Sequence, residues 1–134
     1  MADHYQQFSF KFGPLTEAEQ VWLKQEVRER EDPDTHDEET RFTASFDIQG
    51  DHAYFWADTS ANLEEVAQLC QDFLAEFAPH KVISFEWSDS CSKPRTNEFG
   101  GGAVIITAES CTWTTTRQWI ESHMHSTAPN RRLN

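Results

Sequence analysis

The chain has 134 residues and carries 23 acidic against 11 basic side chains, a formal net charge of −12. This balance argues against direct binding to nucleic acid or to an anionic membrane, because both need net cationic contacts, and it favours basic protein surfaces as partners. The length suits one domain with a substantial core, to which 10 Phe and 5 Trp contribute. No apolar run approaches the length that crosses a bilayer.

The cysteines indicate the compartment. Cys70, Cys91 and Cys111 form an odd, widely spaced set, which is unlike a disulfide framework or a zinc site. The first residues also lack the charged and then apolar pattern of a secretory signal. We therefore expect a reduced, cytoplasmic protein and find no motif for a metal or another cofactor. The sequence leaves the oligomeric state open.

Alternating aromatic residues predict the first strand, and a capping box predicts the first helix. The strand positions are Phe8, Phe10 and Phe12. Their period of two is that of a half-buried strand, which Gly13-Pro14 ends. Thr16 and Glu19 then form the capping box, so we expect a helix from there to about Glu31. Its expected apolar side consists of Leu15, Ala18, Val21, Trp22 and Val27.

The middle of the chain predicts a hairpin, a second helix and a further strand. The first arm of the hairpin carries Phe42, Ala44, Phe46 and Ile48 at alternate positions. Gln49-Gly50-Asp51 turns the chain, and His52–Asp58 forms the returning arm. Asn62 is the expected cap of the next helix, which Pro79 ends. The apolar face of this helix consists of Leu63, Val66, Ala67, Cys70, Phe73, Leu74 and Phe77. Alternating apolar residues then predict a strand over Lys81–Asp89.

The order of these elements predicts an α+β fold. Strand, helix, strand, strand, helix and strand is the ferredoxin-like βαββαβ arrangement, in which an antiparallel sheet carries two helices on one face. Two further strands are expected at Ala103–Ala108 and Thr112–Thr116. Because the first of these is apolar on both faces, it needs cover on both.

A third helix is expected over Arg117–His125. It would turn Trp119 and Ile120 inward, with Met124 as a further candidate, and it would supply cover for the open face of the sheet. We see no internal repeat and no domain boundary. The expected organisation is a single domain over residues 1–125 and a flexible tail over residues 126–134.

The stretch from Cys91 to Gly102 combines a thiol, two cations, a proline and three glycines between two predicted strands. It can be an anion-binding loop, because glycine N–H groups can converge on a phosphate or carboxylate beside cationic side chains. The residues of that site would be Cys91, Lys93, Arg95, Gly100, Gly101 and Gly102. The alternative, which we favour, is structural, since Pro94 stiffens the exit from one strand and glycines permit a positive φ or a bulge before the next. The residue order excludes a Walker motif.

The same stretch carries a resemblance to known proteins. It rests on the string Cys91-Ser92-Lys93-Pro94-Arg95, followed by Glu98-Phe99-Gly100-Gly101-Gly102-Ala103-Val104. In this string, and in the Trp-bearing segment that ends in Trp119-Ile120, the chain resembles a family of small uncharacterised proteins carried by phages and plasmids. That family has no assigned activity, so the resemblance implies a mobile-element context and no particular reaction.

Residues 26–39 form a strongly acidic run, the acidic segment. Its carboxylates are Glu26, Glu29, Glu31, Asp32, Asp34, Asp37, Glu38 and Glu39, opposed by Arg28 and Arg30. Anions near a helix C-terminus oppose the helix dipole, and crowded like charges repel, so such a run favours a surface that meets cations. We interpret it as a docking face for a basic protein, such as one that normally holds a nucleic-acid backbone, whose phosphate row the carboxylates partly imitate. The alternatives are a solvated, mobile loop that keeps the protein soluble, and a metal site, although Asp32, Asp34 and Asp37 do not match a calcium loop.

Catalytic groups are few. Lys93 and Arg95 lie near Cys91 in the sequence and could activate it as a nucleophile. Such a cysteine needs a histidine and an orienting acid, and the histidines considered are His80, His123 and His125. Nothing in the sequence fixes any of them near the sulfur, so the alternative is a buried structural thiol.

Two functions follow from these patterns. The first is a non-enzymatic acidic interaction protein of a mobile element that binds, and thereby inhibits, a basic protein such as a host-defence nuclease. The second is a small-molecule or anion-binding protein, enzymatic or not, built on the Cys91–Gly102 loop. We favour the first, because net charge and the acidic segment both support it.

Overall fold

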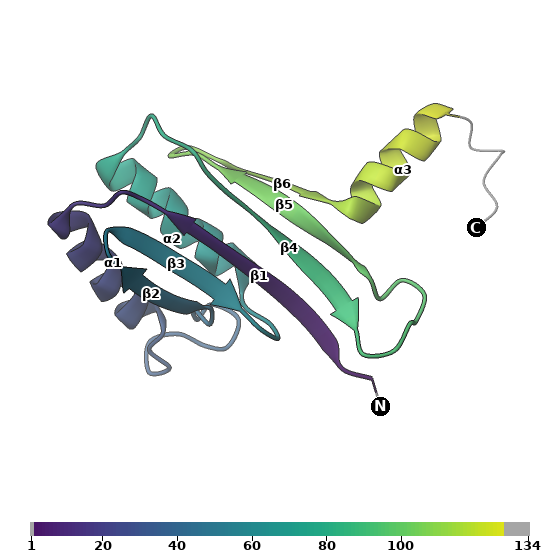
Figure 1. The fold of residues 1–134 in the computed structure, drawn as a ribbon, viewed down its shortest axis with the longest axis horizontal. Coiled ribbons are helices and arrows are strands. Elements are labelled where there is room, and N and C mark those ends of the chain that lie inside the picture. The colour runs from purple at the N-terminus through teal and green to yellow at the C-terminus, as the bar shows by residue number, and fades with distance from the viewer. Residues whose placement is uncertain (1, 128–134) are drawn as a thin grey trace.

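The computed structural model describes residues 2–127. Figure 1 shows one extended sheet with three helices. In chain order the elements are β1 (His4–Phe12), α1 (Glu17–Arg30), β2 (Ser45–Gln49), β3 (His52–Ala57), α2 (Leu63–Phe77), β4 (Ile83–Cys91), β5 (Gly100–Ile106), β6 (Cys111–Thr115) and α3 (Thr116–Thr127). The predicted α+β class is confirmed, and each predicted strand and helix has a counterpart. None of the described helices is long and apolar enough to cross a membrane.

The sheet has six strands in the order β2-β3-β1-β4-β5-β6, and every neighbouring pair is antiparallel. The short connections between β4, β5 and β6 add these strands one after another at one edge, as hairpins do. The two strands that were expected in addition to the βαββαβ arrangement join the same sheet as β5 and β6, and the resulting six-stranded order differs from that of a four-stranded ferredoxin-like sheet. The ferredoxin-like assignment is therefore not confirmed.

The core is a run of aromatic rings on the helix-covered face of the sheet. Phe10 lies opposite Phe55 in the ladder between β1 and β3, and its ring stacks on those of Phe55 (5.1 Å between centroids) and Phe85 (4.7 Å). Successive side chains of a strand alternate between faces, so Phe8 and Phe12 lie on the same side as Phe10, as predicted. The apolar residues of α2 close this core, and its fully or nearly fully buried side chains include Leu63, Val66, Ala67, Leu69, Cys70, Phe73 and Leu74.

Helix α1 begins as predicted but buries only part of the predicted side. Thr16 Oγ1 accepts a hydrogen bond from the Glu19 N–H (3.2 Å), and the Glu19 carboxylate accepts one from the Thr16 N–H (2.8 Å), which completes the capping box. Of the predicted apolar side, Val27 is buried as expected, whereas Ala18 is exposed and Val21 is 54% exposed. Leu23, which the prediction omitted, is buried together with Val27. They are four residues apart and therefore share one face of the helix.

Helix α3 does not cover the sheet. Trp119 is 60% exposed and Ile120 46%, so the prediction that they face inward is wrong; Met124 is half-buried. The helix follows β6 without an intervening residue, and in Figure 1 it extends away from the sheet. It continues to Thr127, two residues past the predicted end at His125. The rest of the predicted tail, residues 128–134, lies outside the described residues.

Candidate functional site

Hydrogen bonds from its own carboxylates shape the acidic segment. Asp32 Oδ1 accepts a bond from the Asp34 N–H (2.9 Å). Asp37 Oδ1 accepts bonds from the Glu39 N–H and from both the N–H and the hydroxyl of Thr40, each at 3.0 Å. Carboxylates that bond to the backbone two or three residues on define local turns. The connection from α1 to β2 thus has a definite conformation, which argues against a formless acidic loop.

These bonds also keep Asp37 charged. The Thr40 hydroxyl, followed by the Thr40 and Glu39 N–H groups, lowers the pKa of Asp37 below its ordinary value of 3.8. The cause is that a hydrogen bond to the ionised form favours that form. Asp37 therefore presents a full negative charge at neutral pH, with its second oxygen free of the turn bonds.

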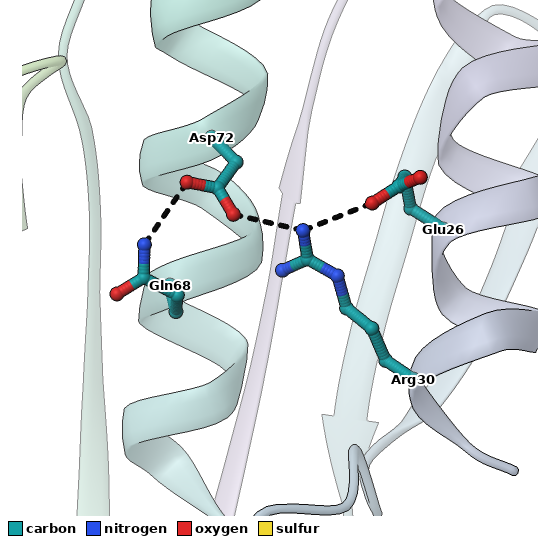
Figure 2. A network of polar contacts seen from close by, with 4 residues as sticks. All are labelled: Glu26, Arg30, Gln68 and Asp72. Atoms are coloured by element: carbon teal, nitrogen blue, oxygen red, sulfur yellow. Dashed lines mark hydrogen bonds and ion pairs between the residues drawn. The ribbon is translucent and has the colours of Figure 1, made fainter. Parts of the chain in front are cut away.

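One cation is built into the helical part of the acidic segment. Arg30 Nη2 lies 3.0 Å from Glu26 Oε1 and 2.8 Å from Asp72 Oδ2 on α2, and Gln68 Nε2 donates to the other Asp72 oxygen (2.9 Å; Figure 2). This network joins α1 to α2. Within residues 2–127, Glu26 is the only carboxylate of the segment in an ion pair. The exposed carboxylates that remain are Glu29, Glu31, Asp34, Asp37, Glu38 and Glu39.

Asn62 ties the acidic segment to α2. Its side-chain Nδ2 donates to the carbonyl oxygens of Glu38 (3.0 Å) and Arg41 (2.6 Å). Asn62 is the N-cap residue of α2, as predicted, but its side chain makes no capping bond to that helix. The amide instead holds the end of the acidic segment beside the first turn of α2, where Glu64 and Glu65 add two more acidic groups.

An aromatic pocket borders this acidic surface. It has a volume of about 510 Å³, and its lining includes Glu39, Glu64, Trp87 and Trp113. The two indole centroids lie 5.7 Å apart at an interplanar angle of 62°, and Trp87 Nε1 donates to Asp89 Oδ2 (3.3 Å). Ring faces beside carboxylates attract cations through both the ring quadrupole and net charge. The pocket is therefore suited to a lysine or arginine side chain.

The residues of the predicted anion-binding loop are divided between three places. Cys91 ends β4, Lys93 and Arg95 are exposed in the connection, and the three glycines begin β5, paired with β4. None of these glycines has a positive φ. A Cβ at Gly101 would meet the carbonyl oxygen of Trp87, and one at Gly102 would meet the Trp87 ring. Close strand packing thus explains two of the glycines, which supports the structural interpretation, while anion binding stays a prediction.

Strand pairing brings together a histidine, a cysteine and a glutamate. His4 and Cys91 are direct partners in the ladder between β1 and β4, and Glu98 comes from the connection that follows β4. His4 Nδ1 lies 2.7 Å from Glu98 Oε2, and one donor atom from each of the three residues lies within 4.8 Å of the other two. Cys91 is buried, whereas the side chains of His4 and Glu98 are 60% and 33% exposed.

This cluster was not predicted from the sequence. The candidate partners of Cys91 were His80, His123 and His125. His80 precedes β4, at the opposite end of that strand from Cys91, and the ring of His123 stacks on Trp119 in α3. The side chain of His125 is not among those described. The predicted first strand began at Phe8 and left His4 outside the sheet. The available signal was the even numbering that His4 shares with Phe8, which places both on one face of a longer strand.

The other two cysteines, Cys70 and Cys111, are in surroundings that keep their thiols protonated. All three are free thiols. Burial raises the pKa of Cys70, and desolvation likewise raises the pKa of the partly buried Cys111. Both thiols are therefore protonated at neutral pH, which disfavours nucleophilic attack and metal binding. Cys91 is the cysteine that lies beside a histidine and a carboxylate.

No protein-family model, curated protein or solved structure matches the chain. The resemblance to proteins of phages and plasmids therefore stays a prediction. Three features of the molecule bear on function: the acidic surface, the aromatic pocket beside it and the cluster of His4, Cys91 and Glu98.

Proposed function

We propose that this is a non-enzymatic interaction protein that binds a basic protein through the acidic segment. The observation that carries the proposal is a run of exposed carboxylates along the end of α1 and a connection whose turns are shaped by backbone bonds to Asp32 and Asp37. Within residues 2–127, Glu26 is the one carboxylate of the segment neutralised by an ion pair. Fixing anions close together is unfavourable for the free protein because like charges repel. A cationic partner surface removes that repulsion on binding.

The aromatic pocket supports the same partner chemistry. Glu39 belongs both to the acidic segment and to the pocket wall, so the two form one continuous surface. Trp87 and Trp113 offer ring faces for a basic side chain inserted between carboxylates. Anchors of this kind, aromatic residues in a partly enclosed pocket, dominate the binding energy of many interfaces. The surrounding charges would steer association and fix orientation.

The partner class follows from the spacing of charge along a helix and a turn. Nucleic-acid-binding proteins carry the basic surfaces that meet a row of phosphates, and a row of carboxylates competes for such a surface. We therefore propose that binding inhibits a nucleic-acid-binding protein. The resemblance to phage and plasmid proteins favours a host-defence nuclease as one such target.

The test begins with a pulldown from host lysate at low and high salt, after which the captured protein is purified and its Kd is measured. Charge reversal to Lys would be made together at Glu31, Asp32, Asp34, Glu38 and Glu39. Exposed ion pairs contribute roughly 0.2–1 kcal/mol each. The affinity of this variant for the captured protein should therefore fall by more than about tenfold, and its Kd should depend much less on salt concentration.

A matched control reverses an equal number of exposed carboxylates elsewhere, at Asp47, Asp58, Glu76, Glu86 and Glu109. This control has the same net charge as the test variant. Equal loss of affinity in both variants would mean that net charge, and not the position of the acidic segment, causes the loss. Undiminished binding by the test variant would exclude the acidic segment as the docking face.

A second candidate function is the binding of a small molecule at the start of β5. One observation favours it, a pocket of about 600 Å³ whose lining includes Asn97, Phe99, Gly100 and Arg117. Lys93 and Arg95 lie outside this lining, so the test of the alternative adds Arg117→Ala to Lys93→Ala and Arg95→Ala. Under this alternative the combined variant loses the binding of an anionic ligand such as inorganic phosphate, whereas the acidic substitutions do not affect it. Isothermal titration separates the two functions.

At the level of the fold, we also propose that β1 to β4 with α1 and α2 form a ferredoxin-like unit. The βαββαβ order of these elements supports it, and β5, β6 and α3 would then be additions at one edge. An experimental structure that pairs β1 with neighbours other than β3 and β4 would exclude this arrangement.

A further inference from the structure

We propose that His4, Cys91 and Glu98 bind a zinc ion. The three residues supply imidazole nitrogen, thiolate sulfur and carboxylate oxygen, the ligand types that zinc takes in proteins. They come from β1, from the end of β4 and from the connection to β5. A bound ion would therefore fasten that connection to the sheet.

The fold directs these side chains toward one point. His4 and Cys91 are opposite each other in an antiparallel ladder, where paired side chains lie on the same face with Cβ atoms roughly 4.5–5.5 Å apart. The donor atoms of the three residues already lie within 4.8 Å of one another. Tetrahedral zinc with bonds of about 2.0–2.3 Å needs donor atoms roughly 3.3–3.7 Å apart. The 2.7 Å between His4 Nδ1 and Glu98 Oε2 is shorter than two ligands of one ion allow, so this hydrogen bond must open when the ion enters. Glu98 can make this adjustment, because it lies in a connection and not in a strand.

A zinc site accounts for the cluster better than a nucleophilic cysteine does. A nucleophile needs its base within hydrogen-bond reach. Cys91 makes no hydrogen bond to His4 or to Glu98, although all three residues are described, and the carboxylate contacts His4 Nδ1 directly. The acid and the histidine are thus in contact, but neither bonds to the sulfur, so a relay from acid to histidine to sulfur is incomplete.

The backbone around the cluster is fixed on both sides. The Asp3 N–H donates to Ser92 Oγ and the Ser92 N–H donates to the Asp3 carbonyl oxygen, both at 2.8 Å. These residues adjoin His4 and Cys91. In the connection, Arg117 Nη1 of α3 donates to Asn97 Oδ1 (3.1 Å), next to Glu98. Ligands carried on such a supported framework lose less entropy when they bind a metal.

The three ligands predict which metal ion binds and which coordination position stays free for water. A thiolate favours zinc over magnesium or calcium, which take oxygen ligands. Three protein ligands leave a fourth tetrahedral position for water. His4 and Glu98 also line the pocket of about 600 Å³, so this position is reached from solvent. Exposed Lys93 and Arg95 oppose a cation only weakly, because solvent screens them.

The test uses the full chain without a polyhistidine tag, titrated with Co²⁺ and then with Zn²⁺. We expect one equivalent to bind and Co²⁺ to give a thiolate charge-transfer band. Zinc affinity is measured by competition with a chromophoric chelator. Cys91→Ser should abolish the band, and His4→Ala or Glu98→Gln should weaken zinc binding by more than the roughly 10–100-fold that loss of an outer-shell partner costs.

The controls are Cys111→Ser and His80→Ala, which keep the band and the affinity. His4 and Glu98 are partly exposed, so their variants test the proposal even if Cys91→Ser fails to fold. Lys93→Ala with Arg95→Ala should leave zinc binding intact, in contrast to its expected effect on an anion. No bound equivalent of Co²⁺, or equal affinity in the three ligand variants and the controls, would overturn the site. The charge-reversal variants of the acidic segment leave these ligands unchanged, so the two proposals fail independently.

Discussion

The helix-covered part of the sheet and its β6–α3 end use aromatic residues in opposite ways. In the covered part, Phe55 is fully buried and its ring contacts four other phenylalanines, Phe10, Phe12, Phe42 and Phe46. At the β6–α3 end, Trp113 is 37% and Trp119 60% exposed. Both parts are rich in aromatic residues, yet only the first has helices to close over them. The difference indicates that stability comes from the first part and that large surface side chains of the second are available for contacts.

The largest expected effect concerns the covered core. Phe55→Ala should lower the free energy of unfolding by about 3–5 kcal/mol, because it leaves a cavity among packed rings. Trp119→Ala, a comparably large truncation in α3, should change it by no more than about 0.5 kcal/mol. Urea denaturation followed by circular dichroism measures both. Similar losses for the two variants would mean that α3 is part of the cooperative core and that the contrast between the two parts is wrong.

A smaller effect is expected where the two parts join, at the glycines of β5. Gly102→Ala should cost about 1–3 kcal/mol, because its Cβ would overlap the Trp87 ring and the Thr114 carbonyl oxygen. Gly100→Ala is the matched control, since its Cβ would come only as near as 3.1 Å to Thr116 Oγ1, which can rotate away. Thermal unfolding of both variants checks that Gly102→Ala is less stable than Gly100→Ala. If Gly102→Ala were as stable as Gly100→Ala, close packing would not explain this glycine.

The smallest effect concerns a single exposed carboxylate. Thr40→Val removes the hydroxyl bond and should raise the pKa of Asp37 toward its ordinary 3.8 without reaching it, because the N–H bonds stay. Since the folded pKa of Asp37 is lowered, its stabilising contribution is present above the unfolded value and is lost as pH falls through the folded one. In the variant the contribution of Asp37 is therefore smaller, and its loss, which still begins near the unfolded pKa, is complete at a higher pH. Carbon-detected NMR titration measures the pKa of Asp37 in both proteins. The control is Thr35→Val, because the Thr35 hydroxyl donates to the Asp32 carbonyl oxygen; this variant should leave the pKa of Asp37 unchanged.

The two candidate sites differ in what the sequence could reveal of them. The acidic segment is contiguous, so counting charges located it, and folding added only its turns and its anchor at Asn62. His4 and Cys91 are 87 positions apart in the chain and meet only because β1 pairs with β4. Such a cluster has no signature in the local spacing of residues. From the sequence, Cys91 and Glu98 were therefore predicted only as parts of a loop, and His4 was not predicted as a site residue.

Sequence by itself determined the element order, the α+β class, the strand phase of Phe8 and Phe10, and the amphipathic face of α2. These depend on local periodicity and capping, which neighbouring residues fix. Tertiary structure decided what depends on distant partners: the six-stranded order, the exposure of Trp119 and the meeting of His4 with Cys91. The physical reason is that local patterns set how a segment curls or extends, whereas burial and strand pairing depend on which other segments lie beside it.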